Sequence, residues 1–150
     1  MSTRIFPTAQ DAENAFYEAL ERCDLDGMMA VWAEDEDILC VHPTGGRLTG
    51  QDQVRESWAK MFAAGPRARL QVTQQVAIGG MMLAVHSVFE NFSLEGAAPG
   101  DARPAPIVAT NVYLRTAAGW RMIVHHASPA PQPAPAAAAE PRGGPPKTLH

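Results

Sequence analysis

One histidine in this sequence, His42, directly precedes Pro43 after a short apolar run. An imidazole takes up or gives up a proton near neutral pH, so His42 is our candidate general acid or base. Further along the chain, His86 and Glu90 are four residues apart in a segment with strand periodicity, which places them on one face. If that face is the concave one, the carboxylate can orient the imidazole for acid–base chemistry; the alternative is an outward cross-strand pair.

The last predicted hairpin carries three more polar candidates. His125 and His126 are adjacent in a strand, so they point to opposite faces and only one of them can enter a pocket. His126 is in phase with the more apolar set of alternating residues, and we expect it to point inward. Asn111 either enters the cavity or bonds across an interface. A shift of one residue in the register of this hairpin would make Thr110 and His125, instead of Asn111 and His126, the residues that face the cavity.

The histidines and cysteines lack the spacing of a metal site. No HxxxH or HxH motif is present, and the ligands would have to converge from three separate elements. Cys23 and Cys40 lie seventeen residues apart without a CxxC motif, which favours two buried thiols. A chain of 150 residues buries enough surface to fold without disulfides or metals. We therefore expect no metal and no cofactor.

Composition excludes several classes of partner. Sixteen acidic and twelve basic residues give a net charge of −4 without a basic stripe, so nucleic acid is not an expected partner. No segment approaches the roughly 18 apolar residues of a membrane span, and Met1 to Gln10 has no leader pattern. We expect a cytoplasmic protein.

The chain divides into a domain over residues 1–128 and a tail over residues 129–150. The tail holds seven prolines, six alanines and no aromatic residue, so it cannot bury enough apolar surface to order itself. Its proline spacing favours polyproline II conformation, which is typical of a solvated terminus and can also serve as a docking segment.

The first half of the domain has helical periodicity. Apolar residues recur every three or four positions in three segments, which predicts one helix over Ala9–Arg22, one between Asp24 and Glu34, and one between Thr49 and Gly65. Large aromatic residues occupy the apolar stripe of each helix and are expected to face the sheet and wall a cavity: Phe16, Trp32 and Trp58.

The second half has strand periodicity. A short strand over Ile38–His42 precedes the third helix, and two hairpins follow it: Arg69–Ile78 with Met81–Phe92, and Ile107–Thr116 with Trp120–Ser128. This order predicts an α+β domain in which three N-terminal helices pack on one face of a curved antiparallel sheet. Such a sheet leaves a hollow between itself and the helices.

Several strings in this order resemble the nuclear transport factor 2-like proteins, in particular the SnoaL-like and ketosteroid-isomerase-like branch, over about residues 9–128. They are Phe16-Tyr17, Asp24-Leu25-Asp26-Gly27-Met28, Trp32-Ala33-Glu34-Asp35, His42-Pro43 with Gly50, and the closing string Gly119 to Ser128. The resemblance implies a cone-shaped α+β barrel of cystatin-like type with a cavity, and a homodimer formed through the sheet. It does not carry a function, because this fold hosts isomerases, cyclases, dehydratases and non-catalytic members.

The isomerase branch uses an aspartate before the proline, where this chain has His42. The resemblance also implies a tyrosine in the first helix where this chain has Phe16, and Tyr17 is about 100° further around the helix and is expected to point elsewhere. Steroid isomerisation by that route is therefore not expected.

Three functional hypotheses remain open. We favour a pocket that binds a small, partly apolar ligand, with no activity assigned. The first alternative is an isomerase, cyclase or dehydratase that uses His42 as general acid or base, with His86, Asn111 or His126 as hydrogen-bonding groups. The second is a non-catalytic dimerisation module in which the same histidines are structural.

Overall fold

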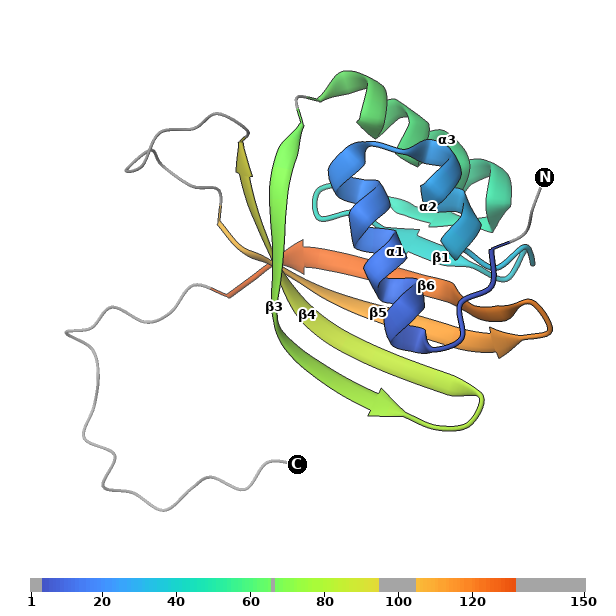
Figure 1. Cartoon of the computed structure of the whole chain (residues 1–150). Helices are drawn as coiled ribbons and strands as arrows, with labels where there is room; N and C mark the ends of the chain where they lie inside the picture. The colour runs from blue at the N-terminus through green and yellow to red at the C-terminus, as the bar shows by residue number, and fades with distance from the viewer. Residues whose placement is uncertain (1–3, 66, 95–104, 132–150) are drawn as a thin grey trace, which may run out of the picture.

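The computed structural model describes residues 4–65, 67–94 and 105–131 (Figure 1). Within these ranges the helices come first and most of the sheet follows, which confirms the α+β class. The elements are α1 (Ala9–Arg22), α2 (Leu25–Val31), β1 (Leu39–Val41), β2 (Arg47–Thr49), α3 (Gly50–Ala64), β3 (Ala68–Gly79), β4 (Leu83–Leu94), β5 (Ile107–Thr116) and β6 (Gly119–Pro129). None of the described helices is long and apolar enough to cross a membrane.

Side-chain caps start the first two helices where the sequence predicts them. Thr8 Oγ1 accepts a hydrogen bond from the Asp11 amide at 3.0 Å, and Asp24 Oδ1 accepts one from the Gly27 amide at 3.0 Å. The predicted bounds of the first helix are confirmed. The second helix is shorter than predicted, because Trp32 has extended backbone and bridges Met122 instead of continuing the helix.

The sheet is mixed, whereas the sequence predicted an antiparallel one. Its strand order is β2-β1-β6-β5-β4-β3, and β1 runs parallel to β6 while the other pairs are antiparallel. A parallel pair needs a long connection between its strands, and the segment from β2 to β5, which includes α3, provides it between β1 and β6. The prediction also missed β2, whose three residues are too few to show a periodicity.

The curved sheet holds the helices on its concave side, and it does not close into a barrel (Figure 1). The aromatic residues predicted to face the sheet lie in the core between the two layers, each at most 1 % exposed: Phe16, Trp32 and Trp58. Phe16 contacts both indoles edge-to-face, with ring centroids 6.5 Å from Trp32 and 5.7 Å from Trp58. These contacts fix α1 and α3 over the sheet.

A β-bulge interrupts the last hairpin. Val112 pairs with Val124, whereas Tyr113 pairs with Met122, so Ile123 is an extra residue on β6. An extra residue reverses the alternation of faces along the rest of the strand.

This bulge corrects the predicted direction of the paired histidines. His125 is buried opposite Asn111, and His126 is exposed opposite Thr110. The prediction that His126 points inward is wrong. The apolar alternation that favoured it holds only before the bulge. Asn111 and His125 lie directly opposite each other in the ladder, so both point inward.

The predicted boundary at residue 128 lies near the end of β6, which runs to Pro129, and Ala130 is buried with its amide bonded to Pro106 O at 2.9 Å. The rest of the predicted tail, residues 132–150, lies outside the described residues.

Candidate functional site

A buried carboxylate at the centre of the molecule, Glu13 on α1, organises a polar cluster between that helix and the sheet. Glu13 is 1 % exposed. It accepts hydrogen bonds from His86 Nδ1 at 3.0 Å, Tyr113 Oη at 3.1 Å and Asn111 Nδ2 at 3.2 Å, and from the Gln75 amide. Because a carboxylate only accepts, Nδ1 of His86 must carry its proton. Both carboxylate oxygens of Glu13 therefore accept hydrogen bonds, which offset the cost of removing a charged group from water.

A second carboxyl, Glu90 on β4, lies in the same cluster with fewer partners. Glu90 is 2 % exposed, and its only hydrogen-bond donor among the described residues is the Tyr17 hydroxyl, at 2.6 Å. Burial raises the pKa of Glu90 to about 7, and the nearby Glu13 charge contributes in the same direction, although the bond from Tyr17 opposes them. This carboxyl therefore changes charge near neutral pH.

Asn111 on β5 links the two carboxyl groups to the interior histidine. Its Nδ2 donates to Tyr17 Oη at 2.9 Å as well as to Glu13, so its Oδ1 is left to accept from His125 Nδ1 at 2.6 Å. Burial lowers the pKa of His125 to about 3, and the neighbouring His42 contributes in the same direction. His125 is thus a neutral donor at physiological pH.

A pocket of about 370 Å³ opens onto this cluster between α1 and the edge strand β3. Glu13 and Tyr17 belong to both the pocket and the cluster, and the remaining lining comes from Gln10, Asn14, Val72 and Gln75. Gln75 lies in a bulge between Thr73 and Val76, in which Gln74 adopts a left-handed φ of 54°. This bulge turns Gln75 toward α1, where its amide bonds to Gln10 Oε1 at 2.9 Å and to Glu13.

The predicted catalytic residue, His42, lies apart from this cluster, beside α3. Its Nε2 is 2.6 Å from Ser57 Oγ, and its ring meets Trp58 edge-to-face with centroids 4.8 Å apart. Burial lowers the pKa of His42, so the ring is neutral at pH 7. Phe16, Trp58 and His125 pack together, and among the described residues the side-chain polar contacts of His42 are with Cys40 and Ser57 rather than with Glu13 or Glu90. A role for His42 as general acid or base stays a prediction.

The structure brings together three of the candidates named from the sequence. His86, Glu90 and Asn111 all point to the concave face and belong to the Glu13 cluster. Phe16, Trp32 and Trp58 form the aromatic core beside it, while His126 lies on the outer face. The indole N–H groups of Trp32 and Trp58 have no acceptor among the described residues.

Sequence reasoning missed Glu13 and Tyr113, and it placed Tyr17 wrongly. Tyr17 is 7 % exposed and points inward, because α1 lies in the hollow of the sheet and buries more than the narrow stripe of a surface helix. A signal was present in the sequence. Glu13 and Tyr17 are four residues apart, so they share a helical face that adjoins Phe16.

No three histidine, cysteine, aspartate or glutamate side chains in the described ranges converge as ligands of a metal ion. Cys40 is buried as predicted, and burial raises the pKa of its thiol to about 12. Cys23, by contrast, is half-buried at the end of α1.

Comparison with known proteins supports the fold. A candidate calcium/calmodulin-dependent protein kinase type II association domain from Thiobacillus denitrificans is 43% identical, with a TM-score of 0.78 over 85% of this chain and 99% of that chain. A candidate dehydratase of the nuclear transport factor 2-like family from Streptomyces avermitilis is 32% identical, with a TM-score of 0.71 over 81% of this chain and 92% of that one.

A more distant structure, from Nostoc punctiforme, has a cystatin-like fold and unknown function; it is 16% identical, with a TM-score of 0.69 over 85% of this chain and 96% of that chain. A search of curated proteins gave no match. The model of the SnoaL-like domain matches residues 10–133, which include every residue of the polar cluster. The chain therefore belongs to the family of SnoaL-like domains, within the nuclear transport factor 2-like superfamily.

Proposed function

We propose that this protein binds a small, partly apolar molecule in the pocket between α1 and β3 and exchanges a proton with it through Tyr17 and Glu90. The observation that carries the proposal is the position of Tyr17, which lines the pocket and donates to the buried Glu90 carboxyl at 2.6 Å. The buried Glu90 carboxyl is thereby connected through Tyr17 to a pocket of about 370 Å³. Small-molecule pockets in proteins have volumes of about 300–1,000 Å³.

The two carboxyl groups have different tasks in this proposal. Glu13 is held by several donors and keeps Asn111 and Tyr113 in place. Glu90 has Tyr17 as its donor and a pKa of about 7, so it is available as base when ionised and as acid when protonated. In the base direction, a ligand proton passes to the Tyr17 oxygen while the Tyr17 hydroxyl proton passes to Glu90.

The lining of the pocket favours a ligand with both polar and apolar parts. Side-chain amides of Gln10, Asn14 and Gln75 supply donors and acceptors at its mouth, and Val72 with the Tyr17 ring supplies apolar surface. The candidate dehydratase that is 32% identical agrees with this chemistry. A dehydration removes a proton from one atom and protonates the departing hydroxyl group, and an acid–base carboxyl suits both steps.

Replacing Gln75 with tryptophan is expected to fill the pocket and weaken ligand binding at least 10-fold without unfolding the protein, because Gln75 lies exposed on an edge strand. The measurement is a protein-observed NMR titration with a panel of small cyclic fragments that each carry one hydroxyl or carbonyl group. Gln71→Trp, at an exposed site four residues earlier in the same strand and outside this pocket, is the matched control.

The titration also tests the proton exchange. Fragment affinity for the wild type is expected to change around pH 7, and this change should be absent in Glu90→Gln. Binding that perturbs only residues beside His42 and Ser57, or that Q75W leaves unaltered, contradicts the proposed site.

A further inference from the structure

A serine and a histidine from different elements meet beside α3. Ser57 lies on that helix, His42 directly follows β1, and Ser57 Oγ is 2.6 Å from His42 Nε2. A serine hydroxyl is a weak nucleophile until an adjacent base takes its proton, and histidine is the base that proteins use most often. The proton exchange proposed for Tyr17 and Glu90 involves neither of these two residues.

The surroundings of His42 favour the tautomer in which Nε2 accepts a hydrogen bond. Among the described residues, His42 Nε2 is the only hydrogen-bond partner of Ser57 Oγ. Burial lowers the pKa of His42, so the ring is neutral and one of its nitrogens has a lone pair. The Cys40 thiol, whose Sγ is 3.8 Å from Nε2, keeps its proton because burial raises its pKa to about 12. Two groups that carry a proton therefore face the same ring nitrogen.

Packing and a backbone turn hold this pair in place. Trp58, the residue after Ser57, is 1 % exposed, and its ring is the one that meets the His42 ring edge-to-face. The backbone of His42 is fixed as well, because its carbonyl accepts a hydrogen bond from the Gly45 amide at 3.1 Å. A nucleophile and a base that are held in this way need little rearrangement before they react.

A pocket of about 340 Å³ opens at Ser57, between α3 and β2. Four of the residues that line it recur at intervals of three and four positions, so they share one face of α3: Gln53, Glu56, Ser57 and Lys60. Leu48 of β2 lines the same pocket. Its volume is within the range of small-molecule sites, and Ser57 is only partly buried, so a small molecule in the pocket reaches the hydroxyl.

Two side chains in this lining can stabilise negative charge on a bound molecule. Gln53 Oε1 accepts a hydrogen bond from the Thr49 amide at 3.0 Å, which leaves Gln53 Nε2 as a donor. Lys60 brings a positive charge and pairs with Glu56 at 3.1 Å. When a nucleophile adds to an ester, negative charge develops on the carbonyl oxygen, and donors near that oxygen lower the barrier. The lining therefore favours an ester as substrate.

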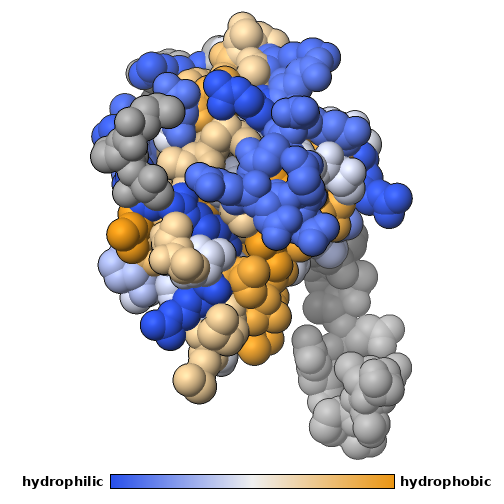
Figure 2. All heavy atoms as spheres, turned by 90° about the vertical axis from the view of Figure 1, so that its right-hand side faces the viewer, coloured by the Kyte–Doolittle hydropathy of each residue, from blue (hydrophilic) through white to orange (hydrophobic). Residues whose placement is uncertain are grey.

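The surface near α3 favours a short, polar ester. Figure 2 shows hydrophilic residues predominating in the upper part of its view, where the helices lie, and apolar residues gathered in the lower part, where the β3–β4 hairpin ends. Within the pocket, Leu48 is the one apolar side chain among the described lining residues, and Glu56 and Lys60 are exposed. Such a pocket has apolar surface for a short acyl group and none for a long hydrocarbon chain.

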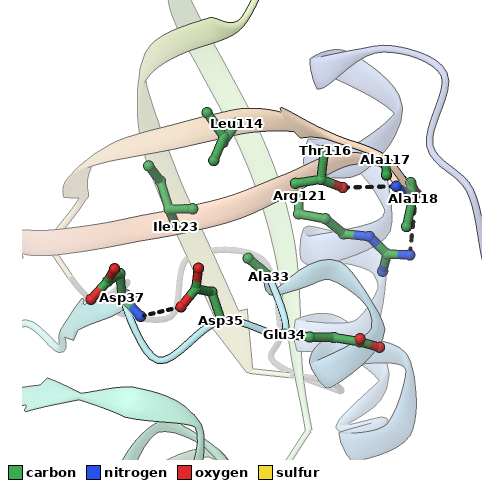
Figure 3. Close-up of a pocket in the computed structure, with 10 residues that line it drawn as sticks. All are labelled: Ala33, Glu34, Asp35, Asp37, Leu114, Thr116, Ala117, Ala118, Arg121 and Ile123. Carbon is green, nitrogen blue, oxygen red and sulfur yellow. Dashed lines mark hydrogen bonds between the residues drawn. The ribbon is translucent and has the colours of Figure 1, made fainter.

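A larger cleft, of about 430 Å³ between the last hairpin and the segment after α2, lacks such a pair (Figure 3). Its described lining contains no serine, cysteine or histidine. The Thr116 hydroxyl there donates to Gly119 O at 2.7 Å, and the Arg121 guanidinium donates to backbone carbonyl groups. Both side chains are engaged within the fold, so the cleft offers no activated nucleophile.

We propose that Ser57 is a nucleophile, activated by His42, that takes up the acyl group of small carboxylic esters. The Ser57 oxygen bonds to the carbonyl carbon while His42 Nε2 takes the hydroxyl proton. The bond from that carbon to the leaving oxygen then breaks, and His42 returns the proton to the departing alcohol. Water, which gives a proton to His42, hydrolyses the acyl-serine, and the released acid and the free hydroxyl restore the site. The proposal does not depend on Glu90 or on the pocket beside β3.

A fluorophosphonate probe tests the nucleophile in the full chain, because it reacts with serines that a neighbouring base activates. The serine oxygen bonds to phosphorus, fluoride leaves, and the proton passes through His42 to water. Intact mass is expected to show one added phosphonyl group, and peptide mapping should place it on Ser57. Ser57→Ala should not be labelled, and His42→Gln, whose amide takes no proton, should be labelled about 100-fold more slowly or less. Ser87→Ala and His126→Gln, on the outer face, are the matched controls and should be labelled like the wild type.

Hydrolysis of 4-nitrophenyl acetate tests the substrate class. The wild type is expected to release several equivalents of nitrophenolate per protein, and S57A and H42Q should lose this turnover. Labelling of Ser57 without ester turnover overturns the assignment of esters.

Two labelling results overturn the proposed nucleophile and base. A wild type that is unlabelled, or labelled at another residue, shows that Ser57 is an ordinary helical serine. Equal labelling rates for H42Q and the wild type show that His42 does not act as its base. The wild-type result is decisive even if a variant misfolds, and circular dichroism of each variant, expected to match the wild type, detects that case.

Discussion

Replacing Glu13 with alanine is expected to lower the free energy of unfolding by about 3–5 kcal/mol, because it removes the shared acceptor of a buried hydrogen-bonded cluster. The substitution leaves the donors of Tyr113, Asn111 and His86 without their acceptor at sites that are at most 5 % exposed. Each buried donor that loses its acceptor costs about 1–3 kcal/mol in the folded state.

Urea unfolding at pH 7 measures this effect. Glu18→Ala on the same helix is the matched control, because Glu18 is exposed and its carboxylate pairs with Arg22 across one turn, at 3.0 Å. Such surface pairs contribute about 0.5 kcal/mol or less. Equal losses for the two variants would show that Glu13 does not organise the interior.

The stability of the wild type relative to Glu90→Gln is expected to fall by about 3 kcal/mol between pH 4 and pH 8. The pKa of Glu90 is raised from 4.5 to about 7 on folding, so between these values the folded state holds a proton that the unfolded state releases. The contribution of Glu90 is therefore fully present below pH 4.5 and is lost as the pH rises through 7. Glutamine has no proton to lose.

The measurement is the difference in unfolding free energy between the two proteins at several pH values. The contributions of the other titrating groups are the same in both proteins and cancel in this difference. Glu18→Gln should show no such dependence on pH, because Glu18 is exposed. If E90Q instead became less stable than the wild type as the pH rose, Glu90 would be a carboxylate stabilised in its ionised form, and the proposed acid–base role would be lost.

Local patterns were sufficient to predict the helices and most of the strands. The caps at Thr8 and Asp24 and the change of period near Arg69 are properties of a few neighbouring residues, and the structure agrees with them. The parallel pairing of β1 with β6 depends on contacts between segments more than eighty residues apart, which no local pattern records.

The sequence predicted part of the polar cluster, again where a local pattern fixes the direction of a side chain. His86, Glu90 and Asn111 lie on regular strands whose alternation fixes their direction. His125 lies beyond a bulge, which inserts a residue without a sequence signature and reverses the alternation. Glu13 was missed because a charged residue on an amphipathic helix is ordinarily assigned to the exposed face.

The position of Glu90 also changes where chemistry is expected. The sequence directed attention to His42, which lies beside Ser57 and outside the Glu13 cluster. The pocket between α1 and β3 reaches Tyr17 and, through its hydroxyl, Glu90. A carboxyl can take the place of the imidazole as the group that titrates near neutral pH, because burial shifts the pKa of a carboxyl upward and that of an imidazole downward.

The most direct test of this account is a titration of the side-chain carboxyl carbon of Glu90 by NMR, assigned by comparison with E90Q. The account predicts a midpoint near pH 7. A midpoint near 4.5, the ordinary value for glutamate, would contradict it, because Glu90 would then be ionised throughout the physiological range and could not act as a proton donor to a ligand in the pocket.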